Sequence, residues 1–291
     1  MPLASQTFSS YSLSVAAIAA LALAAACTEA PPLELPTDPG AGAVYAFVQR
    51  GWILDRAAAH SVDLDGDGHP DNQLGRLIDV LGSLGLAVND AGAEQFASGE
   101  LRIAHVVRAD SLDDGTAAWT LRSGAGAPPR FDGTDQLTLP VADGGMVGRI
   151  VGGRFEARAG ELTLRVPLFP GQPAMAIPVV DGVVQLALRG GCGGTLAGAI
   201  GPAALDALVD VMAAEAVAHL AAHPDHPFTA TAIRFLDSDG DGRVSAAEVA
   251  DLALGLLVPD VDLDGDGAAD HVAVGLGFDC VPARAITAAT R

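Results

Sequence analysis

Side-chain oxygens recur at metal-ligand spacing in the segment 237–248, DSDGDGRVSAAE. Carboxylates at alternate positions can converge on one point, a glycine at position six permits a sharp turn, and a glutamate at position twelve supplies two further oxygens. Hard oxygen ligands of this kind favour a calcium ion. The predicted Ca²⁺ ligands are Asp237, Asp239, Asp241, the backbone carbonyl of Arg243, Ser245 and Glu248.

This segment resembles the loop of the EF-hand family, because every diagnostic position of that loop is matched. Its flanks agree: Ser245 and Glu248 form a Ser-x-x-Glu capping box at the start of a predicted helix, and residues 228–236 can form a short helix before the loop. The resemblance implies a helix–loop–helix unit that holds one calcium ion. The alternative is a turn rich in Asp and Gly without metal, in which the carboxylates would repel one another.

Two further acidic loops share the sequence VDLDGDG, at 62–68 and 261–267. They resemble the calcium repeats of the thrombospondin type 3 family, because they share its D-x-D-x-D-G-x-x-D core. They are not complete EF-hand loops, because Leu74 and Ala273 stand at position twelve, where an EF-hand has glutamate. Fewer ligands imply weaker binding, and the alternative for the first loop is a turn that caps the following helix. The predicted ligands are Asp63, Asp65, Asp67 and Asp71 in the first loop, and Asp262, Asp264, Asp266 and Asp270 in the second.

The sequence indicates other metal or catalytic sites less strongly than the calcium loops. Glu215, His219 and His223 have i, i+4 spacing on a predicted helix and could share a face to hold zinc, although histidines at a helix end also favour the negative end of the helix dipole. The sequence has no G-x-S-x-G nucleophile motif, no Walker loop and no dinucleotide-binding glycine motif after a strand. We therefore predict that the protein is not an enzyme and assign no catalytic residue.

Helices and strands must position these loops. Apolar residues at one-face spacing predict helices that begin near residue 73, at 91 and after Gly201. Eight short β-favouring runs between 101 and 188 predict antiparallel strands, joined by a strand at 44–54 and two closing strands near the end of the chain. The Gly-rich segment 190–201 is predicted to be a tight turn.

The predicted fold class is α+β. Its β-rich antiparallel centre would form a sandwich or a strongly curved sheet, with flanking helices and a C-terminal EF-hand. The predicted regions are a signal peptide (1–26), a tether rich in Pro and Gly (27–43), a region with the first acidic loop, helices and strands (44–200), and a helical EF-hand region with closing strands (201–291).

The beginning of the chain predicts export. Residues 1–26 carry no charged side chain, and the apolar run 13–26 directly before Cys27 resembles a bacterial lipoprotein signal with Cys27 as the lipidated residue. An ordinary secretory signal and a cytoplasmic Ala-rich helix are the alternatives. The even pair Cys192 and Cys280 is predicted to form a disulfide in an oxidising compartment.

The net charge of −20, from 36 acidic and 16 basic residues, argues against nucleic acid or anionic lipid as a partner. A membrane contact is expected only through the lipid anchor. We predict an exported, calcium-binding lipoprotein of the cell envelope, similar as a whole to uncharacterised bacterial lipoproteins, in which calcium is mainly structural. The alternatives are a calcium-dependent binding module for a glycan or an envelope protein, and a calcium-supported hydrolase.

Overall fold

The computed structural model describes residues 42–285, except residues 56–57, 84, 86–87, 138–140, 159, 170 and 190. The predicted signal peptide 1–26, the predicted lipidation site Cys27 and all but the last two residues of the predicted tether lie outside the described residues. No helix in the described part of the chain is long and apolar enough to cross a membrane.

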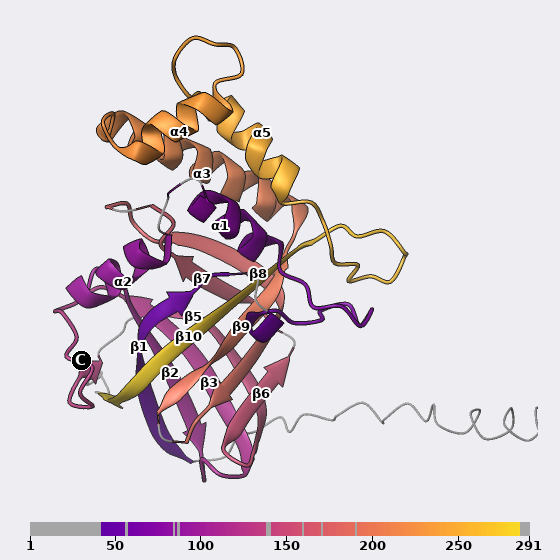
Figure 1. The fold of residues 1–291 in the computed structure, drawn as a ribbon. Coiled ribbons are helices and arrows are strands. Elements are labelled where there is room, and N and C mark those ends of the chain that lie inside the picture. Colours follow the sequence, from indigo (N-terminus) through magenta and orange to yellow (C-terminus); the bar gives the residue numbers. More distant parts are fainter. Residues whose placement is uncertain are drawn as a thin grey trace, which may run out of the picture. The chain divides into compact units, whose positions relative to one another are not determined.

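Eight antiparallel strands form a closed barrel (Figure 1), because the last strand of the chain pairs with the first as well as with its other neighbour. In order around the barrel they are β1 (Ala43–Ile53), β2 (Arg102–Ala109), β3 (Gly115–Gly124), β5 (Val141–Val151), β6 (Arg154–Arg158), β8 (Met175–Ala187), β9 (Cys192–Ile200) and β10 (Val272–Ala285). The short strand β7 (Leu162–Val166) pairs with β5 and β8, the two strands that also flank β6. The shortest, β4 (Gln136–Leu137), runs parallel to β10.

The predicted fold class, an α+β protein with a sandwich or curved sheet and a C-terminal EF-hand, is therefore wrong. The sheet closes on itself, and most of the regular structure is β. The helical region around residues 237–248 does not end the fold, because β10 follows it and closes the barrel between β9 and β1. Alternating buried and exposed residues are common to strands of sandwiches and of barrels, so the pattern alone could not distinguish them.

The boundaries of three strands also differ from the predictions. The segment 190–201, predicted to be a tight turn, contains β9. Two predicted runs join into the single strand β8. The first predicted closing strand and the start of the second join within β10, and the rest of the second lies outside the described residues. Small residues explain the error in β9: a Cβ atom at Gly194 would lie 1.8 Å from the carbonyl oxygen of Gln185 in β8. Glycine there reflects close approach of two strands, which a single sequence does not show.

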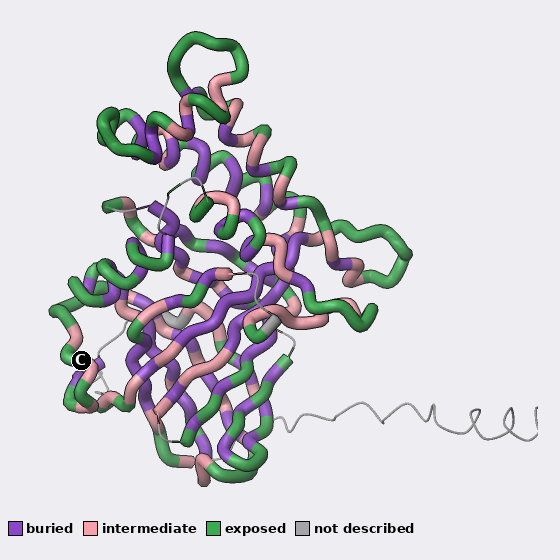
Figure 2. Tube along the Cα trace, viewed as in Figure 1, coloured by how far each residue is buried: buried purple, intermediate pink, exposed green. Residues whose placement is uncertain are grey.

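Apolar side chains fill the barrel, and Figure 2 shows the buried residues alternating with exposed ones along the strands. A buried polar cluster also lies inside the barrel. His105 and Gln49 have no exposed surface, and the imidazole Nε2 lies 3.1 Å from the Gln49 side-chain oxygen. Trp119 donates its indole N–H to His105 Nδ1 at 3.3 Å. Both imidazole nitrogens are thus hydrogen-bonded, as buried polar atoms generally are.

Five α-helices lie in the described part of the chain: α1 (Gln73–Ser83), α2 (Val88–Ser98), α3 (Pro202–Ala222), α4 (Pro227–Leu236) and α5 (Ala246–Leu256). They include the helices predicted from periodicity. Figure 1 shows α1, α3, α4 and α5 gathered at one end of the barrel, where α1 contacts β10 and α3 contacts α5. A short 3₁₀ helix, η1 (Ala58–His60), precedes the first acidic loop and lies against β9 and β10.

A disulfide joins Cys192 in β9 to Cys280 in β10. The two residues are directly paired in the antiparallel ladder, and their Cα atoms lie 4.7 Å apart. The cross-link therefore joins two neighbouring strands of the barrel, 88 residues apart in the chain and on either side of the helical region.

Candidate metal centres

Each of the three acidic loops brings a group of carboxylate oxygens together. Within each group, one oxygen per residue lies within 4.8 Å of the others; the groups are Asp63, Asp65 and Asp71; Asp237, Asp239 and Glu248; and Asp262, Asp264 and Asp266. The predicted ligands Asp67, Asp241 and Asp270 lie outside these groups. Three oxygens from one short loop leave room for backbone carbonyls and water to complete the six to eight ligands that calcium takes.

The loop at 237–248 joins α4 to α5, and its backbone folds around Asp237. The Asp237 carboxylate accepts hydrogen bonds from the amides of Gly240 at 2.7 Å and Gly242 at 2.8 Å. Both glycines have left-handed backbone angles, with φ of 76° and 84°, that residues with a Cβ rarely adopt. The Asp–Gly spacing thus produces the tight turn that the sequence predicts.

Glu248 connects the two ends of this loop. Its Oε1 accepts from the amide of Ser238 at 2.6 Å and its hydroxyl at 2.9 Å, while Oε2 accepts from the amide of Ser245 at 2.8 Å and its hydroxyl at 2.9 Å. The backbone hydrogen bond from Ser245, followed by that from Ser238, lowers the pKa of Glu248 to about 2. The side chain is therefore a carboxylate at neutral pH and is held beside Asp237 and Asp239.

Of the remaining side chains predicted as ligands in this loop, only that of Asp239 belongs to the carboxylate group. Asp239 and Asp241 each accept a hydrogen bond from the backbone amide two residues further on, at 3.0 and 2.8 Å. Asp239 faces the shared group, whereas Asp241 does not belong to it. The hydroxyl of Ser245 forms hydrogen bonds with Glu248 in the capping box that begins α5. These hydrogen bonds compete with the predicted role of Ser245 as a calcium ligand. Arg243 offers only its backbone carbonyl to such a site.

The first and third acidic loops lie together, although almost 200 residues separate them in the chain. Asp262 donates its backbone amide to the Asp65 carboxylate at 3.3 Å. Each loop is closed at its base by an antiparallel bridge, between Val62 and Asp71 and between Val261 and His271. Figure 1 shows both loops extending from the same side of the barrel. Their shared sequence therefore corresponds to two similar loops in contact.

A small apolar cluster holds these two loops against the barrel. Leu64 from the first loop and Val261 from the third are buried together with Ala197 and Ala199 of β9 and Ala273 of β10. The alanine at position twelve of the third loop, which removes a possible ligand, is thus a packing residue of the barrel. This position explains why the third loop leads into a strand and does not begin a second helix.

Asp260 is a carboxylate near this pair of loops that the sequence analysis missed. Burial raises its pKa to about 6, and the nearby carboxylates of Asp71 and Asp65 add to the increase. Burial also raises the pKa of Asp71, with further contributions from the other aspartates of its loop. Asp260 accepts a hydrogen bond from the amide of Ala273 at 2.8 Å. An acidic residue directly before the repeat was the available signal, but no loop motif includes it.

The weaker zinc arrangement considered for Glu215, His219 and His223 does not form. Among the described residues, Glu215, His219 and His223 are not a set whose ligand atoms lie within 4.8 Å of one another. The two imidazole rings lie 4.5 Å apart between centroids, and His223 Nδ1 lies 2.9 Å from the backbone oxygen of His219. The histidines therefore pack with each other and with the end of α3.

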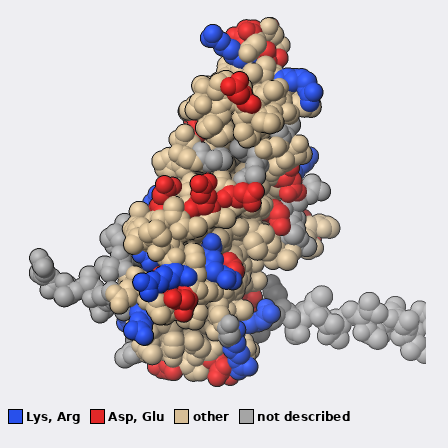
Figure 3. Space-filling model, turned by 60° about the vertical axis from the view of Figure 1, so that its left-hand side comes forward, with Lys and Arg blue, Asp and Glu red and all other residues tan. Residues whose placement is uncertain are grey.

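Charges of both signs lie on the face drawn in Figure 3, where arginine side chains gather on the barrel below a row of acidic side chains. All 16 basic residues of the chain are arginines. The acidic row gives this part of the surface a negative potential that attracts cations.

Comparisons with protein-family models, curated protein sequences and solved structures found no match for this chain. The resemblance to EF-hand and thrombospondin type 3 loops therefore depends on the loop residues themselves.

Proposed function

We propose that this is an exported calcium-binding protein of the cell envelope, in which calcium mainly stabilises the folded structure. The observation that supports it most is the convergence of Asp237, Asp239 and Glu248 within 4.8 Å, in a loop with EF-hand spacing between two helices. Three carboxylates at this separation repel one another, and a divalent cation among them would relieve the repulsion.

Calcium in the 237–248 loop would be held by these three side chains, with the Arg243 carbonyl as a further oxygen ligand. Weaker sites are proposed in the first and third loops, around Asp63, Asp65 and Asp71 and around Asp262, Asp264 and Asp266. Three bound calcium ions would change the net charge from −20 to −20 + 6 = −14. The bound ions would therefore also reduce the general electrostatic repulsion within the folded chain.

Mass action supports a structural role. A ligand that binds only the folded protein adds about 0.4 kcal/mol per site to the free energy of unfolding when its concentration equals the dissociation constant, and about 1.4 kcal/mol at ten times the dissociation constant. Extracellular calcium modules have dissociation constants of about 10⁻⁴ to 10⁻³ M, so such sites are substantially filled at the calcium concentrations outside cells. Calcium at these loops would act as a constant support of the fold.

The proposal predicts that Glu248→Gln weakens calcium binding by at least about tenfold, because the exchange removes one charge from the site and retains nearly the same side-chain volume. Isothermal titration calorimetry on metal-free protein would measure the dissociation constant. Thermal unfolding with 10 mM calcium and with EDTA would measure the stabilisation. We expect a higher melting temperature with calcium in the native protein, and a smaller increase in the variant.

Asp251→Asn is the matched control, because Asp251 is an exposed acidic residue of α5 outside the carboxylate groups. This variant should bind calcium like the native protein. Equal melting temperatures of the native protein in calcium and in EDTA, or equal calcium affinities of the two variants, would contradict the proposal.

The envelope location is proposed from the residues before the folded region. Cys27 would carry a lipid anchor, and residues 28–43 would serve as the tether to the barrel. A Cys27→Ser variant should move from the membrane fraction to the soluble fraction of its host cells. An unchanged distribution would contradict the anchor, while leaving the calcium proposal to its own experiment. A glycan or an envelope protein is the partner class consistent with this location.

A further inference from the structure

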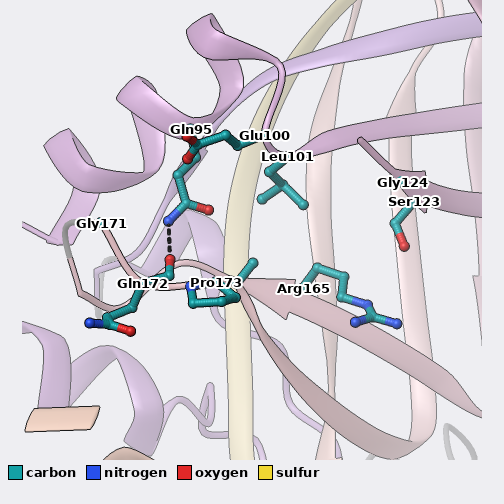
Figure 4. A pocket seen from close by; sticks show the side chains of 10 residues that line it. Gln95, Glu100, Leu101, Ser123, Gly124, Arg165, Gly171, Gln172 and Pro173 are labelled. Atoms are coloured by element: carbon teal, nitrogen blue, oxygen red, sulfur yellow. Dashed lines mark hydrogen bonds between the residues drawn. The ribbon is translucent and has the colours of Figure 1, made fainter. Parts of the chain in front are cut away.

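A polar cavity of about 510 Å³ lies between α2 and the rim of the barrel, away from the acidic loops. Its walls come from α2 and the turn after it, from the end of β3, from β7 and from residues 171–174 (Figure 4). The volume is within the range of sites that bind small molecules. The side chains that matter for its chemistry are those of Gln95, Glu100, Leu101, Ser123 and Arg165.

Arg165 is held firmly in one wall. Its Nη2 lies 3.5 Å from Oδ1 of Asp143, whose side chain is 3% exposed, and the other oxygen of Asp143 accepts a hydrogen bond from the Ser123 hydroxyl. Trp52 donates its indole N–H to the Arg165 carbonyl at 2.9 Å. The Arg165 side chain is about one-third exposed, and only its Nη2 lies near Asp143. Among the described residues no hydrogen bond is made by its Nη1, so the wall offers a guanidinium donor to a ligand, whereas the unpartnered Nε is buried within the wall.

Gln95 supplies a complementary group on another wall. It is 4% exposed, and its side-chain N–H donates to the carbonyl of Gln172 at 2.7 Å. This hydrogen bond fixes the amide so that its oxygen points away from Gln172 into the space beside α2, as Figure 4 shows. Within the described residues this oxygen accepts no hydrogen bond. The exposed carboxylate of Glu100 lines the same cavity, so acceptors gather here.

Together these groups define the chemistry of the ligand. A guanidinium that is ready to donate favours a carboxylate, while the Gln95 oxygen and the Glu100 carboxylate favour an N–H or ammonium donor. Leu101 and the proline at 173 form an apolar lining that suits a small hydrocarbon group. A neutral sugar offers no charged acceptor to the Arg165 guanidinium, and an inorganic anion offers no ammonium group to the Glu100 carboxylate.

We propose that this cavity binds a small zwitterionic carboxylate, of the amino acid or dipeptide class, with its carboxylate at Arg165 and its N–H donors at Gln95 and Glu100. This binding site is separate from the calcium loops and does not depend on the proposed calcium function. It adds a ligand-binding role at the rim of the barrel.

The test uses the folded, calcium-saturated protein and three probes: the twenty free amino acids as a mixture, the dipeptide Ala-Ala, and Ala-Ala with an amidated C-terminus. Saturation-transfer NMR would detect binding, and calorimetry would give dissociation constants. We expect binding of the dipeptide or of a free amino acid, and at least tenfold weaker binding of the amidated dipeptide than of Ala-Ala. Failure of all the carboxylate probes to bind, or equal binding of the acid and the amide, would overturn the proposal.

Two substitutions locate the site. Arg165→Lys keeps the charge beside Asp143 but removes the planar pair of Nη donors, and Gln95→Met keeps the side-chain size but removes the acceptor; each should weaken binding at least tenfold. Arg189→Lys is the control, because Arg189 is exposed and pairs with Asp113 outside the cavity. Melting temperatures would verify folding. If a folded Arg165→Lys variant binds the probes as strongly as the control, the proposed site is wrong.

Discussion

At the scale of single residues, His105 shows how the closed barrel changes the chemistry of a side chain. The imidazole is fully buried, stacks on the Phe278 ring at 4.3 Å between centroids, and bonds to Gln49 and Trp119. Burial lowers its pKa to about 3, because the charged form loses its hydration. Its Nδ1 accepts from Trp119, which indicates the neutral tautomer with the proton on Nε2.

This environment predicts that His105 stays neutral well below pH 6.5. The unfolded chain takes up a proton near pH 6.5, whereas the folded protein resists protonation until about pH 3, so the stabilisation from neutral His105 is complete above pH 6.5. It decreases as the pH falls from 6.5 towards 3, by up to about 1.4 kcal/mol per pH unit. The imidazole proton shifts of His105, followed by NMR between pH 7.5 and 4.5, should not change.

A His105 titration with a midpoint near 6.5 in folded protein would contradict this assignment. The spectra should be recorded at saturating calcium, so that changes in the acidic loops do not contribute.

At the scale of elements, the close approach of β8 and β9 depends on glycine. Because a Cβ at Gly194 would lie 1.8 Å from the Gln185 oxygen, Gly194→Ala requires the two backbones to separate. We expect a decrease in the free energy of unfolding of about 3 kcal/mol or more, at or above the upper end of typical overpacking costs. Urea denaturation monitored by tryptophan fluorescence would measure it.

Gly51→Ala is the matched control for this prediction. Gly51 also lies in a barrel strand, β1, but a Cβ there would meet no atom within 4 Å. The control should change the free energy of unfolding by less than about 1 kcal/mol. Similar effects of the two substitutions would show that strand proximity at Gly194 is not the limiting factor.

At the scale of the whole molecule, the first and third acidic loops lie next to the strands that close the barrel. The first loop follows β1 in the chain and the third leads into β10, and β1 pairs with β10 from Ala46↔Ala283 to Ile53↔Gly277. Calcium in these loops should therefore slow hydrogen exchange of the amides in β1 and β10 more than in β5 and β6. Exchange measured by mass spectrometry with calcium and with EDTA would test this.

Equal protection of all the strands by calcium would contradict this local effect and would instead indicate stabilisation of the whole fold as one unit. The Glu248→Gln variant provides a control, because its substitution lies in the other loop. In that variant the protection of β1 and β10 by calcium should persist.

The sequence by itself determined the local features. The spacing of Asp, Gly and Glu in 237–248 sets the loop geometry, because each short side chain bonds to amides two to five residues away. The helices, the first strand and the pairing of the two cysteines also followed from local periodicity and from the even cysteine count. These features depend on neighbours in the chain or on simple counting.

Only the tertiary structure decided closure of the barrel, contact between the first and third loops, and the cavity around Arg165. Each of these joins residues that are distant in the chain, such as Asp65 with Asp262. The physical reason is that strand alternation specifies which faces are buried but not which strand is the neighbour. Pairing between β1 and β10 is chosen by the packing of the complete chain, so a single sequence without aligned relatives does not reveal it.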